Sequence, residues 1–368
     1  MNPQHLLHIF PTFGPGGVQI RMAAVMNHLA ADYRHTLVAL DGENAASDRF
    51  DGGVAIEFAE APALGGHLPA RLKRIRKELA ALRPDGLLTY NWGSIEWVLA
   101  NKFWGSVPHI HLESGFGREE TDRQIFRRAL VRRLALRRID ALVVPSRKLA
   151  RIAAGSWKVR PDLVKLIPNG ADLARFAAGT PPEPRSWLDS CDLIVGTVAP
   201  LRPEKNLGRL VRAFAALPTS VNAGLAIVGD GAEREGLRRE AEQLGIADRV
   251  HFAGYQSRPE CWLADFDVYA LSSDTEQMPN TIVQAMAASK PIVATDVGDV
   301  AEMVAPQNVP FVVPARNGDG YKAALETLLL DAPLRAGIGA ANRARAEERY
   351  DQTAMFTAYR ELFGEVFC

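Results

Sequence analysis

The sequence alternates short apolar runs of strand length with longer amphipathic runs, and this pattern occurs twice along the chain. Apolar runs separated by helix-length segments are typical of parallel strands joined by helical crossovers. The pattern therefore predicts two α/β domains, each built on a doubly wound parallel sheet. The expected strands are LLHIF, HTLVAL, VAIEFA, GLLTY, PHIHL and ALVVP in the first half, and LIVGTVA, GLAIVGDG, RVHFAGY, VYALSS, PIVATD and PFVVP in the second. Helices of the first half are expected to begin near Val18, Leu68, Ser94, Asp122 and Arg147.

A stretch rich in proline and charge, GTPPEPRSW at 179–187, separates the two sets of strands and is typical of an interdomain linker. A chain of 368 residues also exceeds one ordinary core. We predict a first domain over residues 1–180 and a second over residues 185–349. The last run, 342–367, has the apolar spacing of one long helix. Its buried stripe would be Tyr350, Met355, Phe356, Tyr359, Leu362 and Phe363.

The composition narrows the class of protein. Apolar residues make up 47% of the chain and charged residues 23%, which is the profile of a folded protein and not of a disordered one. The formal net charge is zero, so the total charge favours no nucleic acid partner. Residues 1–180 nevertheless carry roughly eight excess positive charges, and the remainder roughly eight excess negative ones. One half is therefore suited to an anionic partner that the other half is not.

The cysteines and the hydropathy bear on the compartment. Cys191, Cys261 and Cys368 are far apart, with no Cys-x-x-Cys pair and no histidine at metal-ligand spacing beside them. We therefore expect neither a disulfide framework nor a zinc site. No stretch approaches the roughly 20 apolar residues that span a bilayer, and the N-terminal apolar run is too short for a signal peptide. These features predict a cytoplasmic protein.

A glycine-rich loop follows the first expected strand. Gly14, Gly16 and Gly17 remove side chains where the strand turns into a helix, so backbone amides there can approach an anion. The pattern is not Gly-x-Gly-x-x-Gly, and no acid follows the next strand at the spacing of a dinucleotide site. Taken alone, the loop is either a ligand contact or a tight turn.

A second loop of interest follows strand LIVGTVA and carries Arg202 and Lys205 just before a helix. Lysine offers a point charge to phosphate oxygens, and arginine offers a planar fork. A solvated basic turn is the alternative interpretation.

The third loop leads into the segment TEQMPNTIVQAMA at 275–287. Pro279 suits the first helical position, so a helix should begin at about Met278 to Asn280. The free amides of the first turn, at Met278, Asn280 and Thr281, would then point outward as an anion site.

Two polar side chains flank that helix start. Glu276 lies just outside the terminus, where its carboxylate can accept hydrogen bonds from hydroxyls, and Gln284 lies two turns in, on the side away from the apolar stripe. A diphosphate over the helix start, a polyol beside Glu276 and a ribose beside Gln284 would together form a nucleotide sugar. Lys205, Arg202 and the helix dipole can neutralise the departing diphosphate, so this chemistry needs no metal.

At this point the chain resembles the retaining glycosyltransferases of family four (group 1). The segments that carry the resemblance are IPNGADLARF, VAPLRPEKN, LAIVGDG, RVHFAGY and, most specifically, TEQMPNTIVQAMAASKPIVATDVGDV. The resemblance spans nearly the whole chain and implies the GT-B fold, with two Rossmann-like domains that face a cleft. It implies an N-terminal acceptor domain, a C-terminal donor domain, and a C-terminal helix, about 350–368, packed back on the N-terminal domain. It also implies a UDP- or GDP-linked donor, no divalent metal and no other cofactor.

The resemblance also implies roles for single residues. Lys205 matches the phosphate-binding lysine, with Arg202 assisting, and Glu276 matches the first acid of the family's Glu-x7-Glu motif, which contacts the donor sugar. We expect these three to be the catalytic residues. The expected donor contacts are Gly16 and Gly17 at the diphosphate, Phe252, Gly254 and Tyr255 at the nucleobase, mainly through their backbone, and Met278, Pro279, Asn280, Thr281 and Gln284.

The chain departs from the family's pattern at three places. Gln284 replaces the second acid of Glu-x7-Glu, which removes a charge-assisted grip on the ribose at a cost of about 1 to 2 kcal/mol in donor binding. Pro200 stands where the family usually has an arginine, and Arg202 follows two places later. Ser114 stands where the first domain often offers a histidine. The candidate acceptor-side residues are therefore His111, Glu113 and Ser114.

The acceptor is less constrained by the sequence. In retaining members, the resemblance implies a same-face reaction in which the donor diphosphate takes the acceptor proton. The family analogy points to a glycan or polyprenyl-linked acceptor in surface polysaccharide or glycolipid biosynthesis. Other classes stay open: a noncatalytic or scaffold member, which the changes at Gln284 and Ser114 allow, and a nucleotide-sugar epimerase, which the motif order argues against. A nicotinamide dehydrogenase, suggested by the glycine-rich start alone, is not expected.

Two basic amphipathic runs lie in the first half: RLKRIRKELAALR from Arg71 and RQIFRRALVRRLALRR from Arg123. They are either solvated helix faces or a surface that docks on anionic lipid headgroups. The second interpretation would place the protein peripherally on the inner face of a membrane. The arginines of the second run that would serve are Arg127, Arg128, Arg132, Arg133, Arg137 and Arg138.

Overall fold

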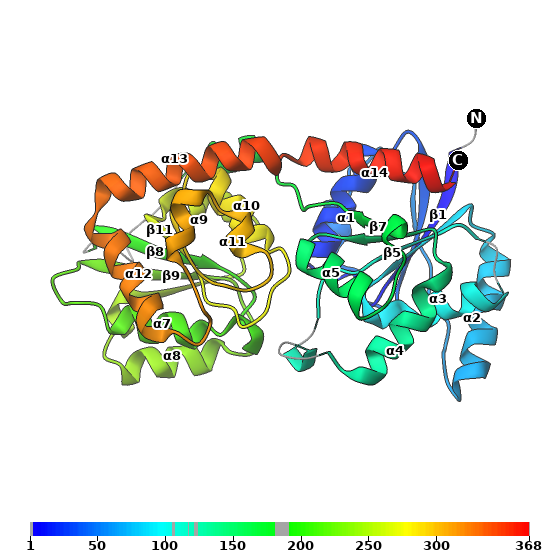
Figure 1. Ribbon diagram of the computed structural model, residues 1–368, viewed down its shortest axis with the longest axis horizontal. Helices are drawn as coiled ribbons and strands as arrows, with labels where there is room; N and C mark the ends of the chain where they lie inside the picture. Colours follow the sequence, from blue (N-terminus) through cyan, green and yellow to red (C-terminus); the bar gives the residue numbers. More distant parts are fainter. Residues whose placement is uncertain (1–2, 105–106, 117, 121–123, 181–190, 368) are drawn as a thin grey trace. The chain divides into compact units, whose positions relative to one another are not determined.

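The structure is a computed structural model that describes residues 3–104, 107–116, 118–120, 124–180 and 191–367. The chain divides into two compact units, each with one parallel sheet (Figure 1). Unit 1 comprises Met1–Gly115, Asp122–Asn169 and Met355–Cys368, and unit 2 comprises Phe116–Thr121 and Gly170–Ala354. Most of the expected linker at 179–187 lies outside the described residues, as do Asp122, Arg123 and Cys368.

The sheet of unit 1 has seven parallel strands in the order β3-β2-β1-β4-β5-β6-β7. The order reverses between β1 and β4, as in a Rossmann-like doubly wound sheet. The six strands expected from apolar runs are present. The seventh, β7, was missed because it has three residues and carries a lysine. The strands are β1 (Gln4–Phe10), β2 (Tyr33–Ala39), β3 (Ile56–Phe58), β4 (Gly86–Tyr90), β5 (His109–Leu112), β6 (Ala141–Val144) and β7 (Val164–Leu166).

The helices of unit 1 begin close to the expected positions. The main ones are α1 (Gly17–His28), α2 (Leu68–Leu82), α3 (Ile95–Trp104), α4 (Phe126–Ala135) and α5 (Arg147–Gly155), and the short 3-10 helix η4 (Leu136–Arg138) follows α4. One face of the sheet is covered by α1 together with α14 (Gln352–Phe367), which lie side by side (Figure 1). The rings of His28 and Phe356 stack between these two helices, with centroids 4.5 Å apart.

The sheet of unit 2 has six parallel strands in the order β10-β9-β8-β11-β12-β13. They are β8 (Leu193–Val198), β9 (Ala223–Val228), β10 (Val250–Gly254), β11 (Val268–Leu271), β12 (Ile292–Thr295) and β13 (Val312–Val313). Each corresponds to an expected strand of the second half, because each lies in one of the apolar runs. The residues of β9, β11 and β12 are all buried, whereas those of the edge strand β10 are only partly buried.

Helices cover both faces of this second sheet, and each face has its own apolar core. One core includes side chains of α9 and α10, and the other includes side chains of α7, α8 and α12. The helices of unit 2 are α6 (Leu173–Ala177), α7 (Leu207–Ala215), α8 (Arg234–Gln243), α9 (Pro259–Asp265), α10 (Asn280–Ala287), α11 (Val300–Met303), α12 (Gly318–Leu330) and α13 (Ala332–Arg349).

The C-terminal run is two helices and not the single one expected. The helix α13 ends at Arg349, and α14 begins at Gln352. Between them the backbone pairs with Ala171: its N–H donates to the carbonyl of Tyr350 at 2.9 Å, and its carbonyl accepts from the N–H of Gln352 at 3.1 Å. This pairing takes Asp351 out of the helical hydrogen-bond pattern, and a partner so distant in sequence leaves no local signal.

The expected apolar stripe of this run is buried. Its residues from Met355 onward belong to the core of unit 1, so α14 packs back on the N-terminal domain as the sequence predicted. Among the described residues, no helix combines the length and the apolar character that crossing a bilayer requires.

Candidate functional site

Two of the loops singled out in the sequence lie at the carboxyl ends of neighbouring strands in unit 2. Strand β8 leads through Arg202 into the 3-10 helix η7 (Pro203–Lys205), and β11 leads through Glu276 into α10. The strands β8 and β11 pair directly in the sheet. Ligands of open α/β sheets bind outside the carboxyl ends of the strands, so this edge is the candidate site.

An ion pair joins the two loops. The Nζ atom of Lys205 donates to Oε1 of Glu276 at 2.5 Å, and the hydroxyl of Ser273 donates to the same oxygen at 2.8 Å. The side chains of Lys205 and Glu276 are 19% and 12% exposed, so the pair is partly shielded from water, which strengthens its attraction. The structure thus brings together the two residues that the sequence assigned to the diphosphate and to the sugar.

A second set of contacts holds these loops in register. Asn206 adopts a left-handed conformation, with φ at 42°, and its side-chain amide donates to Oδ1 of Asp274 at 3.0 Å. Arg209 donates to the same oxygen at 2.6 Å and to the carbonyl of Ser272 at 2.5 Å. The backbone N–H of Asp274 donates to the carbonyl of Glu204 at 2.9 Å. Because these contacts flank the Lys205–Glu276 pair, they fix the relative position of its two loops.

The hydrogen bonds that join Asn206 and Arg209 to Asp274 were not predicted from the sequence. The available signal was the asparagine ahead of a helical pattern, since Asn206 caps α7 by accepting from the N–H of Arg209 at 3.3 Å. Nothing local to the sequence pairs Arg209 with Asp274, because Arg209 lies in the first turn of α7 and Asp274 lies in the loop after β11.

The helix α10 begins at Asn280, within the range that the sequence predicted. Pro279 precedes the helix as its N-cap residue and is not its first helical residue. The apolar side chains of Ile282 and Val283 are buried in the core, whereas Gln284 is half-buried. Gln284 therefore lies on the side of α10 away from the core, as expected.

A glycine allows the loop after β12 to approach the Glu276 loop. Gly298 has φ at 60°, and a Cβ atom there would lie 2.4 Å from the carbonyl oxygen of Gln277. The next residue, Asp299, donates its backbone N–H to that same carbonyl at 2.9 Å. Both the backbone conformation and the space therefore require glycine at this position.

Arg202 has an exposed side chain just before η7, whereas Lys205 carries the ion pair with Glu276. Pro200, which stands where an arginine was expected, accepts a hydrogen bond from the N–H of Arg202 at 2.9 Å through its carbonyl. Arg202 is therefore on the loop where the sequence placed it, without a role in holding Glu276.

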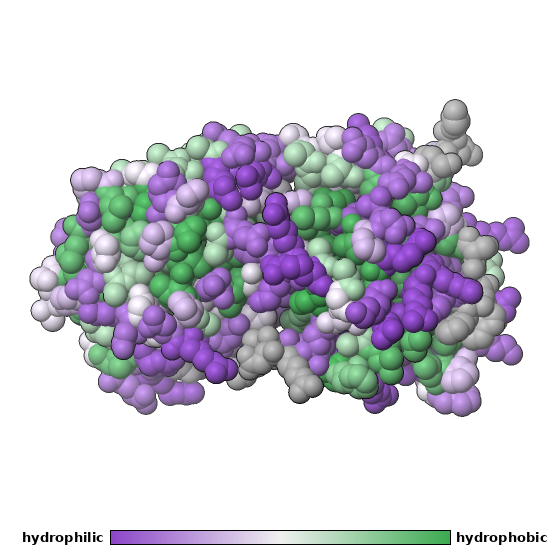
Figure 2. All heavy atoms as spheres, in the orientation of Figure 1, coloured by the Kyte–Doolittle hydropathy of each residue, from purple (hydrophilic) through white to green (hydrophobic). Residues whose placement is uncertain are grey.

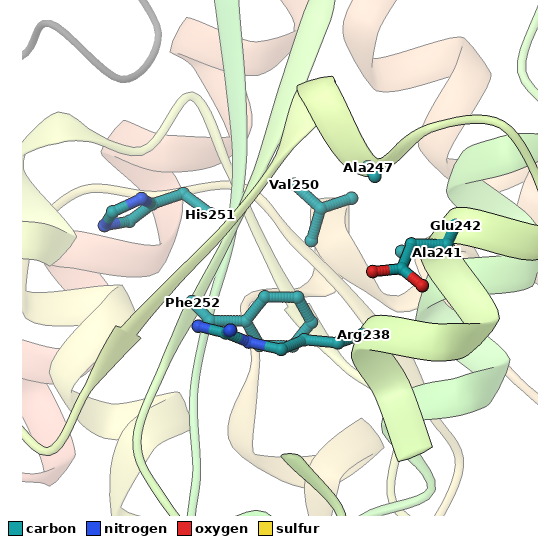
Figure 3. Close-up of a pocket in the computed structure, with 7 residues that line it drawn as sticks. All are labelled: Arg238, Ala241, Glu242, Ala247, Val250, His251 and Phe252. Carbon is teal, nitrogen blue, oxygen red and sulfur yellow. The ribbon is translucent and has the colours of Figure 1, made fainter. Parts of the chain in front are cut away.

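The residues expected at the nucleobase lie around the end of β10. Gly254 has φ at 70° and Tyr255 is 58% exposed. The ring of Phe252 faces α8, where the guanidinium carbon of Arg238 lies 5.6 Å from the ring centroid. Figure 3 shows these two side chains together, with His251 pointing away from them.

The hollow beside Phe252 does not coincide with the candidate site. It has a volume of about 300 Å³ and extends to Val250, the first residue of β10, away from the carboxyl edge of the sheet (Figure 3). Its lining residues are Arg238, Ala241, Glu242, Ala247, Val250, His251 and Phe252. Since the side chain of Phe252 lies in this hollow, only its backbone is placed to serve a ligand at the carboxyl edge.

In unit 1, the glycine-rich loop leads directly into α1. Gly16 is the N-cap residue of this helix, and Gly17 is its first residue. A Cβ atom on Gly16 would lie 2.6 Å from Oε1 of Gln19, whose amide nitrogen donates to the carbonyl of Thr12 at 2.9 Å. Because Gly16 has no side chain, the loop can lie close to Gln19 of α1, and no side chain at Gly16 covers the backbone of the loop.

Of the three acceptor-side candidates, only Ser114 is more than marginally exposed. Its backbone N–H donates to Oδ1 of Asn91 at 2.8 Å, and its hydroxyl accepts from Arg21 of α1 at 3.0 Å. Arg21 also donates to Oδ1 of Asn169. Ser114 is therefore fixed between the first helix and the loops after β4 and β7.

His111 and Glu113 are fully buried. Nδ1 of His111 lies 2.7 Å from the hydroxyl of Thr89, and burial holds the pKa of His111 well below its usual range. Glu113 accepts from Nε of Arg132 at 3.1 Å. These contacts favour an internal, positioning role for both residues, because neither side chain reaches the surface.

No cluster of three or more His, Cys, Asp or Glu side chains in the described part of the chain is arranged to hold a metal ion. The metal independence expected from the sequence stays a prediction.

Models of two protein families match the chain. Residues 15–175 match Glycosyltransferase Family 4, and residues 185–345 match Glycosyl transferases group 1. The chain is 27% identical over 231 residues to the lipopolysaccharide core biosynthesis glycosyltransferase LpsE of Rhizobium meliloti strain 1021. The aligned region covers 62% of this chain and 65% of that protein. It is 30% identical over 163 residues to LpsD of the same organism, which covers 43% of this chain and 48% of that protein. The chain thus spans less than two thirds of the length of either relative.

The fold is similar to the crystal structure of Anabaena Alr3699/HepE in complex with UDP and glucose, with a TM-score of 0.82 and 19% identity over 98% of this chain and 100% of that one. At this identity the likeness shows the fold alone, which is that of two Rossmann-like domains. Because the two family models together cover most of the chain, in the order that the resemblance predicted, the chain belongs to the group 1 glycosyltransferases of family 4 and has the GT-B fold.

Proposed function

We propose that the protein transfers a sugar from a UDP- or GDP-linked donor to a glycan or lipid-linked acceptor. The observation that carries this proposal is the ion pair between Lys205 and Glu276 at the carboxyl edge of the second sheet. A nucleotide sugar needs a cation for its diphosphate next to a carboxylate for its sugar hydroxyls, and this pair supplies both. Membership of a glycosyltransferase family supports the same activity.

Donor binding then replaces the ion pair with two contacts. The diphosphate takes over Nζ of Lys205, and the sugar hydroxyls donate to Glu276, which keeps its hydrogen bond from Ser273. The exposed guanidinium of Arg202 and the N-terminal end of α10 add positive potential near the departing phosphate. Stabilising charge that develops on the leaving group is a large term in such reactions.

The transfer step itself needs no basic side chain. The bond between C1 of the sugar and the phosphate oxygen breaks, and that oxygen takes the proton of the acceptor hydroxyl. The acceptor oxygen forms the new bond to C1 on the same face, so the configuration at C1 is retained. Lys205 stabilises the diphosphate as its charge grows. This step is consistent with the absence of an exposed carboxylate or histidine among the three acceptor-side candidates, of which Ser114 alone is half-exposed.

The relatives suggest where to look for substrates. HepE was crystallised with UDP and glucose, so UDP-linked hexoses are the first donors to test. LpsE and LpsD are named for lipopolysaccharide core biosynthesis, so we propose a surface polysaccharide or glycolipid as the acceptor class.

The test is release of nucleoside diphosphate from a panel of UDP- and GDP-sugars, with and without added chelator. We expect slow release from one donor in the absence of an acceptor, unchanged by chelation. The anomeric configuration of the transferred sugar, read by NMR, then distinguishes retention from inversion. No release from any donor and no binding of any nucleotide sugar would favour a noncatalytic member of the family.

A further inference from the structure

Helix α4 presents its apolar stripe to solvent. Phe126, Leu130 and Leu134 follow one another at intervals of four residues and so share one face of the helix. Their exposed fractions are 81%, 44% and 44%, and Ile125, just before the helix, is 37% exposed. A surface helix of a folded domain ordinarily turns such a stripe toward the core.

The inward-facing side of α4 is held by an arginine. Arg132 is 1% exposed, and its Nε donates to the buried carboxylate of Glu113 at 3.1 Å. Its guanidinium carbon also lies 4.9 Å from the ring centroid of Trp92 and 5.0 Å from that of Trp157. Rotating α4 to hide the apolar stripe would expose Arg132 and leave Glu113 buried without this charge partner, which is strongly unfavourable. The outward orientation of the stripe is therefore built into the fold.

Cations flank the stripe. No Asp or Glu occurs from 124 to 139, and the exposed arginines of α4 and η4 are Arg127, Arg133, Arg137 and Arg138. Two of the six arginines that the sequence suggested for a docking surface do not belong to it. Arg132 is buried, and Arg128 is half-buried, with its guanidinium carbon 5.4 Å from the ring centroid of Trp92. Figure 2 shows hydrophobic side chains gathered over α4 with hydrophilic ones beside them.

A second basic surface lies on helix α2. It packs against α3, which in turn packs against α4. A shallow hollow of about 490 Å³ on α2 is lined by Ala70, Lys73, Arg74, Arg76, Lys77 and Ala80, and its four cationic residues are exposed. These cations belong to the same unit as α4 and carry the same sign, so the helices α2 to α4 together have an excess of positive charge.

We propose that α4 and η4 dock unit 1 on the surface of an anionic lipid bilayer. The three apolar side chains would enter the boundary between headgroups and acyl chains, and the four exposed arginines would contact lipid phosphates. An apolar stripe bordered by cations and without acids fits this occupant. A second copy of the chain would instead set like charges against each other, and three side chains offer far less than the roughly 800 Å² per partner of a stable protein interface. The inference does not depend on glycosyl transfer, since docking requires no donor.

The experiment is co-sedimentation of the full chain with vesicles, in the absence of any nucleotide sugar. We compare vesicles of phosphatidylcholine alone with vesicles that also contain phosphatidylglycerol. The stripe variant is Phe126→Ser with Leu130→Ser, and the matched control is Leu244→Ser with Leu330→Ser, which replaces leucines of unit 2 that are 42% and 64% exposed.

We expect the wild type and the control to bind the anionic vesicles. The affinity of the stripe variant for these vesicles should be lower by a factor of about ten or more. Replacing Arg133 and Arg137 by glutamate should weaken binding as well, and added salt should weaken the binding of the wild type. Equal thermal midpoints of all variants show that loss of binding is not loss of fold. The single variant Phe126→Ser, at the most exposed position, serves if the double variant does not fold.

Three results would overturn the inference. The first is no binding of the wild type to anionic vesicles. The second is binding that the stripe variant retains in full, which would assign it to charge elsewhere. The third is a wild-type dimer in solution that the stripe variant converts to a monomer, which would identify a second copy as the occupant.

Discussion

Nζ of Lys205 lies 2.5 Å from Oε1 of Glu276, so two residues separated by 71 positions in the sequence neutralise each other at the carboxyl edge of the second sheet. Each is thereby already satisfied in the ligand-free protein. A donor must supply phosphate oxygens for the lysine and hydroxyl donors for the carboxylate at the same time. This relationship favours a ligand that carries both groups.

Replacing Glu276 by glutamine should lower the affinity for the sugar part of the donor and not the affinity for its diphosphate part. The variant loses a charged acceptor for the sugar, worth about 1.5 to 3 kcal/mol, so affinity for the nucleotide sugar should fall about 10- to 100-fold. Affinity for the nucleoside diphosphate alone should stay equal or rise, because Lys205 no longer has a competing carboxylate. Calorimetric titration with both ligands measures this split.

The matched control for that experiment is Glu326→Gln. Glu326 forms an ion pair with Lys322 one helical turn away on α12, at 2.6 Å, and such pairs at partly exposed positions contribute little. Neither ligand should change in affinity. An equal loss of affinity for both ligands in Glu276→Gln would show that this residue does not contact the sugar.

Replacing Gln284 by glutamate should strengthen donor binding. Gln284 is half-buried on the side of α10 away from the core, and a carboxylate there would accept two charge-assisted hydrogen bonds from a ribose. A gain of about 1 to 2 kcal/mol corresponds to roughly 5- to 30-fold in affinity. Titration with nucleoside diphosphate measures it, with Gln243→Glu at the exposed end of α8 as control. Unchanged or weaker binding in Gln284→Glu would place the ribose elsewhere.

Two glycine substitutions in unit 2 should have opposite effects on stability. In Gly298→Ala, a left-handed backbone and a close carbonyl both oppose the new methyl group, and we expect a loss of about 2 kcal/mol or more. In Gly337→Ala, the methyl group meets nothing within 4 Å on the exposed side of α13, and we expect a gain of about 0.5 to 1 kcal/mol. Thermal midpoints measure both. A Gly298→Ala variant as stable as the wild type would mean that the loop after β12 relaxes away from Gln277.

Acid should destabilise unit 1 through its buried histidines. Burial lowers the pKa of His35 from 6.5 to about 4 and that of His109 from 6.5 to about 3. Below pH 6.5 the unfolded chain binds protons that the folded chain does not, so stability falls as the pH is lowered from about 7 toward 4. At about pH 4, His35 alone accounts for a loss of about 3 kcal/mol in the free energy of unfolding.

Thermal midpoints recorded between about pH 7 and pH 5 test this sign. The midpoint should fall with pH in the wild type and fall less steeply in His35→Gln. The variant His67→Gln, which replaces an exposed histidine of the same unit, should keep the wild-type slope. A midpoint that is constant or rises on acidification contradicts the assignment.

The sequence predicts most of the fold because the signals of the strands are local. Each buried parallel strand is a run of apolar residues, and Pro279 marks the start of α10 to within one residue. The strand β7 and the break at Asp351 escape this reasoning. The first is short and charged, and the second depends on backbone pairing with Ala171, far away in the sequence.

The sequence predicted the residues of the candidate site but not the contacts between them. The glycines, Lys205 and Glu276 follow from loop chemistry and family resemblance, but their direct pairing depends on which strands are neighbours. The burial of Arg132 is the sharper example. In a run of arginines nothing local distinguishes the one that meets Glu113, Trp92 and Trp157, because those partners come from three other segments.

The most direct test of the account is donor turnover in Lys205→Ala at saturating nucleotide sugar, with Lys322→Ala as control. Lys322 is also a partly exposed lysine paired with a glutamate, but on α12. We predict a fall in turnover of about 100- to 1000-fold for Lys205→Ala, because the leaving diphosphate loses its closest cation, and no change for Lys322→Ala. Wild-type turnover in Lys205→Ala would contradict the central claim that the paired lysine of this site serves the departing diphosphate.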